Sequence, residues 1–341
     1  MNIPVDLPTI WFLLVGVLLT GYAILDGFDL GIGALHLLTK SDLERRIMIN
    51  SIGPVWDGNE VWLVTGGGAL FAAFPEAYAT AFSGFYLAMM LLLVGLIFRA
   101  VAIEFRSKRE SVVWRKFWDT SFSISSILSA FLVGVALGNV GWGVPLDQNF
   151  EFVGTFFGLL HPYALMVGIT TVALFMMHGA IYGVLKTEGE LQQKVRSWVN
   201  NTIIFFIICY AMTTIATLIY IPHMLERFRD NPVLFLLPLL SILAIANIPR
   251  SIHLRKEGWA FISSCAAIAA LLALYGLGMY PNLITGIPYE NSLDIYRAAS
   301  SEKTLGIMLL VAALGVPMVV AYTISIYWIF RGKVQLNEHS Y

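Results

Sequence analysis

Charged residues are scarce in this sequence: Asp, Glu, Lys and Arg make up 13% of its 341 residues, against 58% hydrophobic residues. A soluble globular domain carries about twice that share of charge, so the composition excludes one. The mean hydropathy of +0.75 indicates a polytopic membrane protein instead. The net charge of -1 lacks the positive excess that is typical of nucleic-acid-binding proteins, and no nucleic-acid partner is expected.

Cysteine is nearly absent, since Cys209 and Cys265 are the two in the chain and each lies within an apolar run. This excludes a disulfide framework and a CxxC metal or redox site. The first apolar run lacks the basic start and the small-residue cleavage site of a secretory signal. We therefore expect it to remain in the protein as a membrane helix.

Histidines are few and scattered, and no CxxCH haem-attachment motif is present. His161 and His178 share one apolar run, but they are about 25 Å apart along a helix, too far to share a metal. Either could be an axial haem ligand, yet a hydrogen bond within the helix bundle explains each more simply. We expect no cofactor-binding, metal-binding or catalytic residue in this chain.

Apolar runs long enough to cross the hydrocarbon core, about 20 residues each, predict nine transmembrane helices and an all-α fold. The predicted spans cover roughly residues 9–37, 52–74, 77–103, 119–141, 155–185, 200–222, 232–248, 259–279 and 304–330. The seventh is the shortest, but without it the alternation of charged loops described next would be lost.

Lysines and arginines concentrate in alternate loops, which predicts the direction of the spans because cytoplasmic loops retain them. Most of the 21 Lys and Arg residues follow spans 1, 3, 5, 7 and 9. The opposite side carries Arg227, Arg229, Arg297 and Lys303. The bias predicts an N-terminus outside the cell and a C-terminus in the cytoplasm.

A weak internal repeat suggests two like-oriented halves. The segment "TKSDLERR" (39–46) follows span 1, and "TEGELQQK" (187–194) follows span 5 on the same side. We expect residues 1–150 to form a first four-helix bundle with a buried acidic cluster and residues 151–280 to form a second one. Residues 281–341 would then hold an outer loop, a peripheral ninth helix and a cytoplasmic tail. Ser41 and Glu44 predict a capping box that starts a short helix between spans 1 and 2.

Several charged residues fall inside the predicted spans. Asp26 and Asp29 lie near the cytoplasmic end of span 1, on one polar stripe with Tyr22, Gly33 and His36. A charge within a bilayer costs several kcal/mol, so such residues usually pair with one another or mark an ion or proton route. At the same level we expect Asp57, Glu60, Asp119 and Arg99.

Two structural explanations compete with a proton route. Carboxylates in the first turns of span 2, after Pro54, are stabilised by the helix dipole, which would account for Asp57 alone. Arg99 could form a purely structural ion pair or triad with Asp29 and Asp119. The acids outnumber the single arginine, however, so at least one carboxyl is expected to keep its proton at neutral pH.

Long stretches of the first half carry a family resemblance. These are "LLVGVLLTGYAILDGFDLGIGAL" (13–35), "ERRIMINSIGPVWDGNEVWLVTGGGALFAAFPEAYATAFSGFYLAMMLLL" (44–93), "FRAVAIEFRSK" (98–108) and "WRKFWD" (114–119). They resemble subunit II of cytochrome bd-type quinol oxidases. The match is dense over about the first 140 residues and looser beyond, although "SSEKTLGIML" (300–309) also fits.

The resemblance implies a bacterial respiratory oxidase of the cytoplasmic membrane that oxidises quinol and reduces oxygen to water. It places haem b, haem d and the quinol-oxidising loop in subunit I, the expected partner, and leaves open a small single-helix subunit. Subunit II then supports assembly of the haem sites and contributes to proton delivery. The resemblance associates Asp57 with proton uptake from the cytoplasm, and it assigns Asp29, Arg99 and Asp119 to a buried polar cluster.

The proton-path candidates are therefore Asp57, Glu60, Asp26 and Asp29, with Glu60 the weaker one. Without the resemblance, a proton-coupled secondary transporter would rank first, because a duplicated bundle with acids inside the membrane suits one. A purely structural assembly subunit is the third interpretation. A transporter would act alone or as a homo-oligomer, whereas an oxidase subunit must bind a haem-bearing chain.

Overall fold

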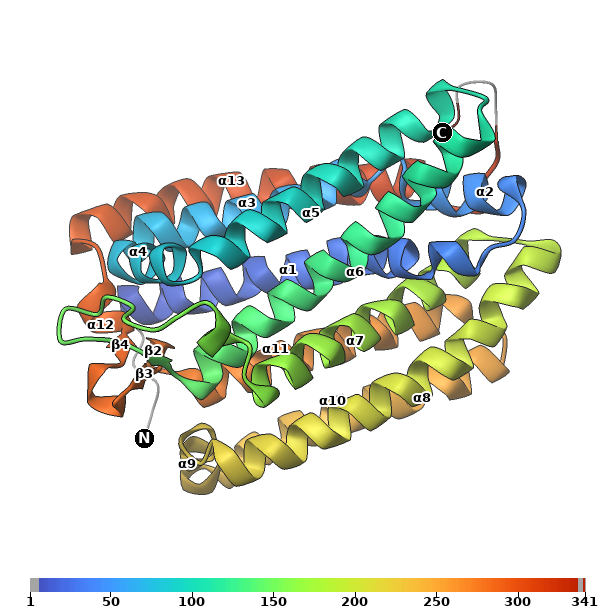
Figure 1. Ribbon diagram of the computed structural model, residues 1–341. Helices are drawn as coiled ribbons and strands as arrows, with labels where there is room; N and C mark the ends of the chain where they lie inside the picture. The colour runs from blue at the N-terminus through green and yellow to red at the C-terminus, as the bar shows by residue number, and fades with distance from the viewer. Residues whose placement is uncertain (1–5, 337–339, 341) are drawn as a thin grey trace.

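The computed structural model describes residues 6–336 and 340, and long helices that run roughly side by side dominate it (Figure 1). In chain order these are α1 (Leu7–Leu35), α2 (Asp42–Ile52), α3 (Trp56–Ala73), α4 (Pro75–Gly84), α5 (Tyr86–Phe105), α6 (Val112–Trp142), α7 (Pro162–Lys186), α8 (Gly189–Tyr220), α9 (His223–Asp230), α10 (Leu236–His253), α11 (Glu257–Met279), α12 (Ile295–Ala298) and α13 (Glu302–Ile329).

Short strands join the connections at the end of the bundle away from α2 (Figure 1). β1 (Val144–Pro145) pairs in parallel with β3 (Gly286–Ile287). β2 (Asn282–Ile284) pairs antiparallel with β4 (Leu293–Asp294). Because β1 follows α6 and β3 follows α11, the parallel pair ties the two halves of the chain together at this end.

Eight of the described helical segments are long and apolar enough to cross a membrane, so the chain is a helical, polytopic membrane protein as predicted. They are Leu7–Leu38, Tyr86–Lys108, Val112–Trp142, Pro162–Lys186, Gly189–Tyr220, Pro232–His253, Glu257–Met279 and Glu302–Ile329. α3 is not among them, because polar residues occupy its first two turns, which include Asp57, Asn59 and Glu60. The count of nine spans and the direction of the termini stay predictions.

Two predicted span boundaries are wrong. The third predicted span, 77–103, is divided, because residues 75–84 form the separate helix α4 and α5 begins at Tyr86. Pro75 has no N–H and disfavours a helical Phe74, which ends α3 at Ala73. The fifth predicted span begins too early at 155, since α7 starts at Pro162 after its cap His161.

The predicted capping box is confirmed at the start of α2. The Glu44 backbone N–H donates to Ser41 Oγ over 3.1 Å, and the Ser41 backbone N–H donates to Glu44 Oε2 over 3.3 Å. These two bonds satisfy backbone donors that a helix start leaves unpaired. They fix where the chain turns after α1 and lies down as α2.

The spacing between the two repeated segments continues along the helices. Adding the difference in residue number between Thr39 and Thr187 to Pro75, the first residue of α4, gives His223, the first residue of α9. Adding the same difference to Phe105, the last residue of α5, gives His253, the last residue of α10. Contacts follow the same pattern: α1 packs on α3 and α6, and α7 packs on α8 and α11.

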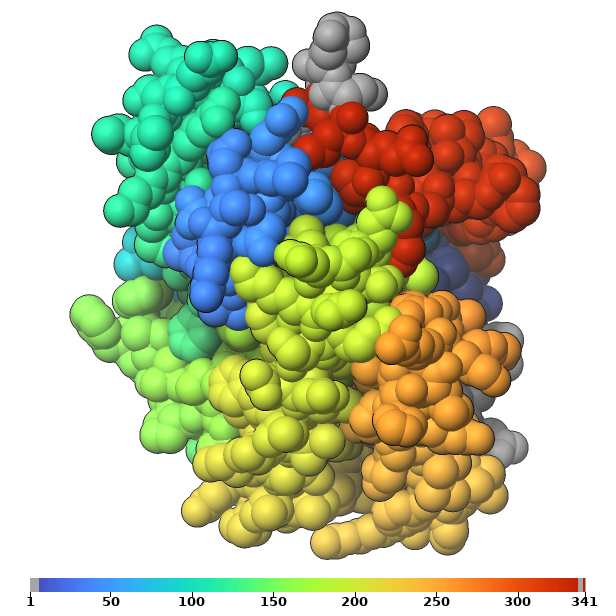
Figure 2. Space-filling view, turned by 90° about the vertical axis from the view of Figure 1, so that its right-hand side faces the viewer, coloured from blue at the N-terminus to red at the C-terminus, as the bar shows by residue number. Residues whose placement is uncertain are grey.

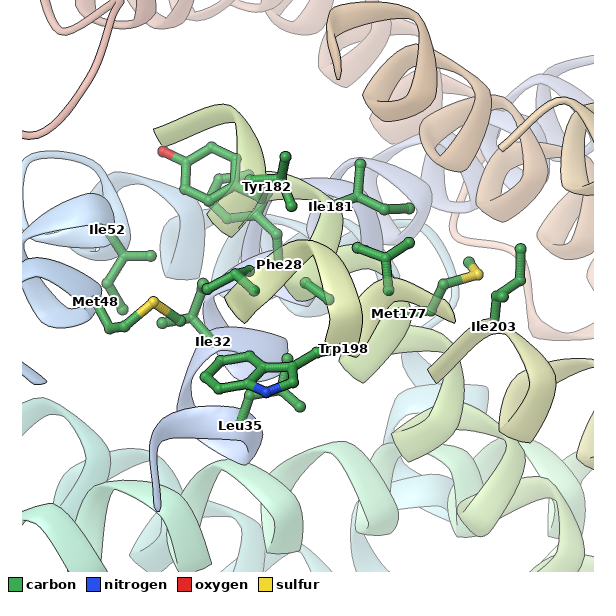
Figure 3. Packing of buried hydrophobic residues seen from close by; sticks show 14 of the residues in the cluster. Phe28, Ile32, Leu35, Met48, Ile52, Met177, Ile181, Tyr182, Trp198 and Ile203 are labelled. Carbon is green, nitrogen blue, oxygen red and sulfur yellow. The ribbon is translucent and has the colours of Figure 1, made fainter. Parts of the chain in front are cut away.

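The two halves meet where α1 crosses α7. Figure 3 shows the buried apolar side chains that pack here, among them Phe28 and Ile32 from α1 and Met177, Ile181 and Tyr182 from α7. The ring of Phe28 stacks on that of Tyr182 with centroids 3.9 Å apart. This packing brings the two repeats into one continuous core.

The closest approach of these helices lies at Gly31 and Gly179, which the repeat spacing makes equivalent. A Cβ atom on Gly31 would lie 1.9 Å from the backbone oxygen of Phe175 and 2.9 Å from the Cα of Gly179. Small residues let membrane helices come this close, where packing rather than hydrophobicity drives association.

We expect Gly31→Ala to separate α1 from α7, because the clash is with backbone that cannot move aside. The cost should be about 3 kcal/mol or more, measured as a lower unfolding temperature of the protein purified in detergent. Gly16→Ala on the same helix is the control, since no atom lies within 4 Å of a Cβ there. Equal stability of the two variants would contradict this account.

Candidate functional site

The acids of α1 lie on a fully buried part of this helix. Every residue from Asp26 to Gly33 is buried, and both carboxylates, like His36 one turn beyond, are 0% exposed. α1 reaches this depth because it packs on α3, α6, α7 and α11. The predicted polar stripe therefore faces other helices rather than lipid.

Asp26 contributes to the first of two charged groups, the inner cluster, which comprises Asp26, Asp29, Glu60 and Arg99. Arg99 Nη2 lies 2.7 Å from Asp26 Oδ1 and 3.1 Å from Glu60 Oε2. The Arg99 side chain is 0% exposed, and that of Glu60 is 20% exposed. One guanidinium from α5 thus connects a carboxylate of α1 with one of α3.

Asp29 is held by an amide instead of a cation. Asn59 Nδ2 donates to Asp29 Oδ2 over 2.8 Å and to the Leu25 backbone oxygen over 3.1 Å. Tyr327 Oη, from α13, donates to Asn59 Oδ1 over 2.8 Å. Asn59, on α3, is therefore oriented by bonds to two other helices, α1 and α13, and it positions the Asp29 carboxyl beside the Arg99 ion pair.

The inner cluster holds three carboxyl groups and one guanidinium. Taking uncompensated charge out of water costs several kcal/mol per ion, so three carboxylates with a single cation would be strongly destabilising. A bound proton reduces the negative charge at little structural cost. The arrangement is thus suited to holding and releasing protons.

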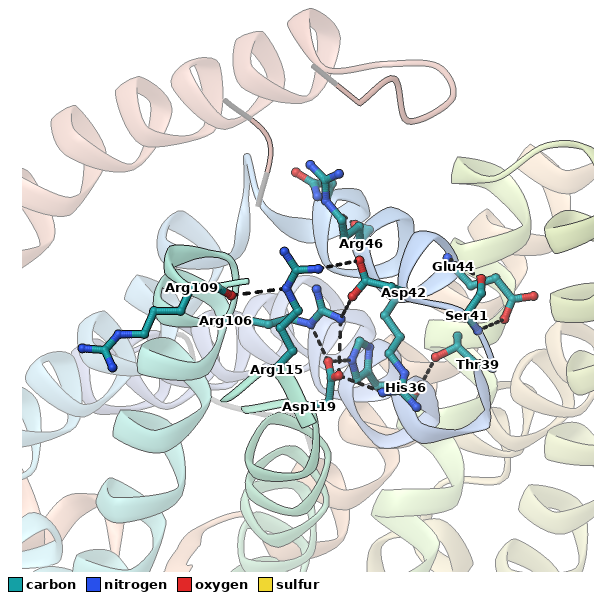
Figure 4. Close-up of polar contacts among 12 residues, drawn as sticks. His36, Thr39, Ser41, Asp42, Glu44, Arg46, Arg106, Arg109, Arg115 and Asp119 are labelled. Carbon is teal, nitrogen blue, oxygen red and sulfur yellow. Dashed lines mark hydrogen bonds and ion pairs between the residues drawn. The ribbon is translucent and has the colours of Figure 1, made fainter. Parts of the chain in front are cut away.

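The second group, the end cluster, lies one layer nearer the α2 end and comprises His36, Asp42, Arg45, Arg106, Arg115 and Asp119 (Figure 4). Asp119 Oδ1 lies 2.6 Å from His36 Nε2 and 2.5 Å from Arg106 Nε, and Asp119 Oδ2 lies 2.9 Å from Arg45 Nη1. Asp42 pairs with Arg106 over 2.8 Å and with Arg115 over 3.1 Å. Here cations match the acids, which is typical of a structural network.

The predicted grouping of Asp29, Arg99 and Asp119 is wrong, because these residues belong to two clusters. Arg99 lies on α5 and Arg106 directly follows the last residue of that helix, two turns or about 10 Å further along. Asp119 lies early in α6 and meets Arg106 across the turn between α5 and α6. Arg99, deeper in the bundle, pairs with Asp26 and Glu60 instead.

Asp57 lies outside both clusters, exposed in the first turn of α3. Glu60 is three residues further along, so the two carboxylates lie on one face of α3. From the surface inward the acids are therefore Asp57, Glu60 and then Asp26 with Asp29. The structure brings together all of the predicted proton-path candidates except Asp57, which stands at the outer end.

Sequence reasoning missed several members of these clusters. It assigned no role to Asn59, Arg45, Arg106 or Tyr327. Asn59 could have been suspected, because a buried amide between Asp57 and Glu60 needs hydrogen-bond partners. Tyr327 carried no such signal, since aromatic residues at the ends of membrane helices usually lie at the interface.

No group of three or more His, Cys, Asp or Glu side chains positioned to hold a metal ion occurs within residues 6–336. His178, the buried histidine of α7, uses both ring nitrogens: Nδ1 is 2.7 Å from Ser264 Oγ and Nε2 is 3.0 Å from the Ile24 backbone oxygen. The ring of Phe261 stacks on it at 5.1 Å. These contacts leave no free nitrogen on His178 for an axial bond.

Comparisons with known proteins agree with one another. Residues 7–330 match the family described as cytochrome bd terminal oxidase subunit II. The chain is 37% identical to the cytochrome bd-I ubiquinol oxidase subunit 2 of Escherichia coli K12, with 97% of each chain covered. It is 32% identical to the cytochrome bd ubiquinol oxidase subunit 2 of Bacillus subtilis, with 98% of each covered.

A solved structure has the same fold. A chain in the structure of the bd oxidase from Geobacillus thermodenitrificans superposes with a TM-score of 0.79, covering 95% of this chain and 98% of that one. The sequence identity is 17%, so this likeness concerns the fold alone.

We expect Arg99→Gln to destabilise the protein by about 3–5 kcal/mol, because it leaves the Asp26 and Glu60 carboxyls without their cation. The measurement is the unfolding temperature of the protein purified from its native membrane. Adding Asp26→Asn to Arg99→Gln removes one stranded carboxyl and should recover part of the loss. Arg109→Gln, at an exposed arginine, is the control; an Arg99→Gln protein as stable as this control would refute the role of the pair.

Glu44 provides a pH-dependent contact between α2 and α8. Its Oε2 lies 2.8 Å from Lys194 Nζ. Burial alone would raise the pKa of the Glu44 carboxyl, but Lys194 and the backbone N–H groups of Lys40 and Ser41 outweigh this and lower that pKa below its usual value.

Glu44→Gln keeps the capping hydrogen bonds and removes the ion pair, so it should cost about 0.5–1 kcal/mol at pH 7. Because the folded-state pKa is depressed, the carboxylate stabilises the protein above the unfolded-state pKa and stops doing so as the pH falls through the folded-state pKa. Unfolding temperatures measured from pH 7 downward should therefore converge for Glu44→Gln and the wild type in acid. Glu110→Gln, at an exposed acid, should show no such convergence, and a constant gap for Glu44→Gln would contradict the assignment.

Proposed function

Since this chain belongs to the family of cytochrome bd terminal oxidase subunit II, we propose that it carries protons toward the haem-bearing subunit of the oxidase and supports the assembly of that subunit. The complex is a quinol:oxygen oxidoreductase, and reduction of oxygen to water consumes protons. The single observation that carries the proposal is the row of acids from exposed Asp57 through Glu60 to buried Asp26 and Asp29.

Each acid has a distinct part in the proposed path. Asp57, at the exposed start of α3, takes up a proton from water. Glu60, partly exposed and bonded to Arg99, is close enough to the surface to exchange protons and reaches the interior. Asp26 and Asp29 share the single Arg99 charge with Glu60, so a proton that arrives offsets excess negative charge there. Arg99 holds these groups in place and stays charged.

Unfilled hydrogen-bonding groups gather at the inner end of this path. Among the described side chains, Tyr22 Oη, Asp29 Oδ1, Arg99 Nε and Arg99 Nη1 have no hydrogen-bond partner. Buried polar atoms of this kind usually bind internal water, which relays protons between carboxyl groups too far apart for direct contact. Their concentration around the inner cluster supports a hydrated route there.

The redox chemistry belongs to haem b and haem d, which we place in subunit I. When bound there, the haems supply electrons to oxygen. In this chain both ring nitrogens of His178 are bonded, and His36 Nε2 is paired with Asp119. Its own residues hold and move protons.

We further propose nine membrane spans, with α3 as the ninth crossing beside the eight apolar ones, an outer N-terminus and a cytoplasmic C-terminus. Residues 1–150 and 151–280 form two four-helix bundles, and residues 281–341 add α13 and the tail. The starts of α4 and α9 and the ends of α5 and α10 are equivalent in the repeat, which supports this division.

The proposed location is the bacterial cytoplasmic membrane, and the proposed partners are subunit I and membrane lipids. Quinol is the substrate of the complex. Whether a small single-helix subunit joins is left open.

A proton-coupled secondary transporter is not favoured, because the family match covers residues 7–330 and is to an oxidase subunit. A role in assembly alone would leave the exposed acid Asp57 without a function. The two roles of subunit II, assembly and proton uptake, are separable by experiment.

We expect Asp57→Asn to slow oxygen reduction by the purified oxidase at least tenfold at saturating quinol, with the haem spectrum unchanged, because the amide cannot carry a proton. Glu60→Gln should slow it less. Glu76→Gln, an exposed acid on α4 at the other end of the bundle, is the control and should keep full turnover.

Two outcomes would overturn the role of Asp57. Normal turnover of Asp57→Asn would exclude proton uptake through this residue. Loss of the haem bands in the same variant would assign Asp57 to assembly instead.

A further inference from the structure

A cavity of about 640 Å³ lies at the α2 end of the bundle, apart from both charged clusters. We call it the tail cavity. The residues around it come from the turn between α2 and α3, the end of α7, the end of α13 and the tail that follows. Those used below are Tyr182, Lys186, Tyr327, Arg331, Lys333 and Gln335.

The described lining of the tail cavity carries positive charge only. Lys186, Arg331 and Lys333 line it, and no Asp or Glu is among the described residues that do. Two carboxylates act on Lys333 from outside the lining, Glu188 and Glu257. Glu257 forms an ion pair with Arg196, which largely neutralises its negative charge.

The two lysines are held in place by the backbone. Lys186 Nζ donates to the Phe330 backbone oxygen over 2.5 Å, and Lys333 Nζ donates to the backbone oxygens of Val184 and Leu185 over 3.2 and 3.0 Å. A lysine at the end of a helix often bonds the last carbonyls, so a structural role accounts for part of this arrangement.

Capping does not account for all three cations. An ammonium has three donors, so Lys186 keeps two and Lys333 keeps one beyond the bonds to carbonyls. Arg331 donates to the Trp328 backbone oxygen and lies over the ring of that tryptophan, 4.0 Å from its centroid, which leaves its other donors available. Three cations fixed around one cavity repel one another unless an anion lies among them.

The surroundings indicate what kind of anion fits. Figure 2 looks at this end of the bundle and shows a notch between the red α13 and the orange α11, with the dark blue α1 at its base. Close to the tail cavity, Trp328 and Ile329 of α13 are 66% and 67% exposed. A polar, cationic cavity beside exposed apolar helix surface matches a phospholipid, whose phosphate lies at the membrane interface and whose chains lie along the helices.

We propose that the tail cavity binds an anionic phosphate group, with the head group of an anionic phospholipid as the source. Lys186, Lys333 and Arg331 bind the phosphate oxygens, and Tyr182 and Tyr327 border the site on its inner side. Because Tyr327 also bonds Asn59, the same residue borders the lipid site and helps to orient Asp29.

The test uses the complete oxidase purified from its native membrane and stripped of loosely bound lipid. Native mass spectrometry follows binding of phosphatidylglycerol, of zwitterionic phosphatidylcholine, and of phosphatidylglycerol in competition with inorganic phosphate. The key variants are Gln335→Glu and Gln335→Lys, which change the charge of the cavity while leaving all three lysine–carbonyl hydrogen bonds intact. Gln335→Glu should weaken the binding of phosphatidylglycerol about fivefold, and Gln335→Lys should strengthen it by about the same factor.

Lys186→Gln combined with Lys333→Gln should abolish selective binding of phosphatidylglycerol, while Lys303→Gln, at the far end of α13, should leave it unchanged. Competition by inorganic phosphate at low millimolar concentration would identify a free phosphate as an equally good ligand. Binding that does not respond to either Gln335 variant, or that shows no preference for phosphatidylglycerol over phosphatidylcholine, would overturn the proposal.

Discussion

The contact between Arg99 and the carboxylates of Asp26 and Glu60 is the constraint on which the rest of this structure depends. A guanidinium cannot give up its proton, so within a membrane it must be paired or it destabilises the fold. Pairing it with α1 and α3 at once fixes the relative height of three helices. Asn59 and Tyr327 then extend the same network to Asp29 and to α13, which is otherwise poorly buried.

The separation of charge into two layers follows from solvent access. The end cluster lies where the chain leaves the bundle, and its acids are matched by arginines that partly reach water. The inner cluster lies deeper and has more carboxyls than cations, an arrangement that tolerates the gain and loss of a proton. The charge-balanced Asp119 of α6 therefore suits a structural role, whereas Asp26 and Asp29 of α1 and Glu60 of α3 suit the proposed proton path.

The repeated halves share a scaffold but differ in chemistry. The difference in residue number that makes Gly179 equivalent to Gly31 makes Leu174 equivalent to Asp26 and Met177 equivalent to Asp29. The second half is therefore apolar where the first is acidic. The same spacing sets Pro54 against Thr202, and the chain breaks into α2 and α3 at the proline but continues as one helix, α8, at the threonine. The break places Asp57 at an exposed helix start. The unbroken helix α8 has no helix start at the equivalent position.

The sequence by itself determined the membrane-spanning character, the family, the position of most helices and the presence of buried acids, because these depend on composition and on patterns within single segments. It also located the capping box at Ser41, whose two bonds are local. It did not determine which acid meets which cation, and it wrongly joined Asp29, Arg99 and Asp119, because ion pairs between helices depend on tilt, depth and rotation. Only the tertiary structure decided that Arg99 pairs across to Asp26 and Glu60, that Asp119 meets Arg106, and that Tyr327 from the far end of the chain holds Asn59. These contacts join residues distant in sequence, where a shift of one helical turn changes every partner.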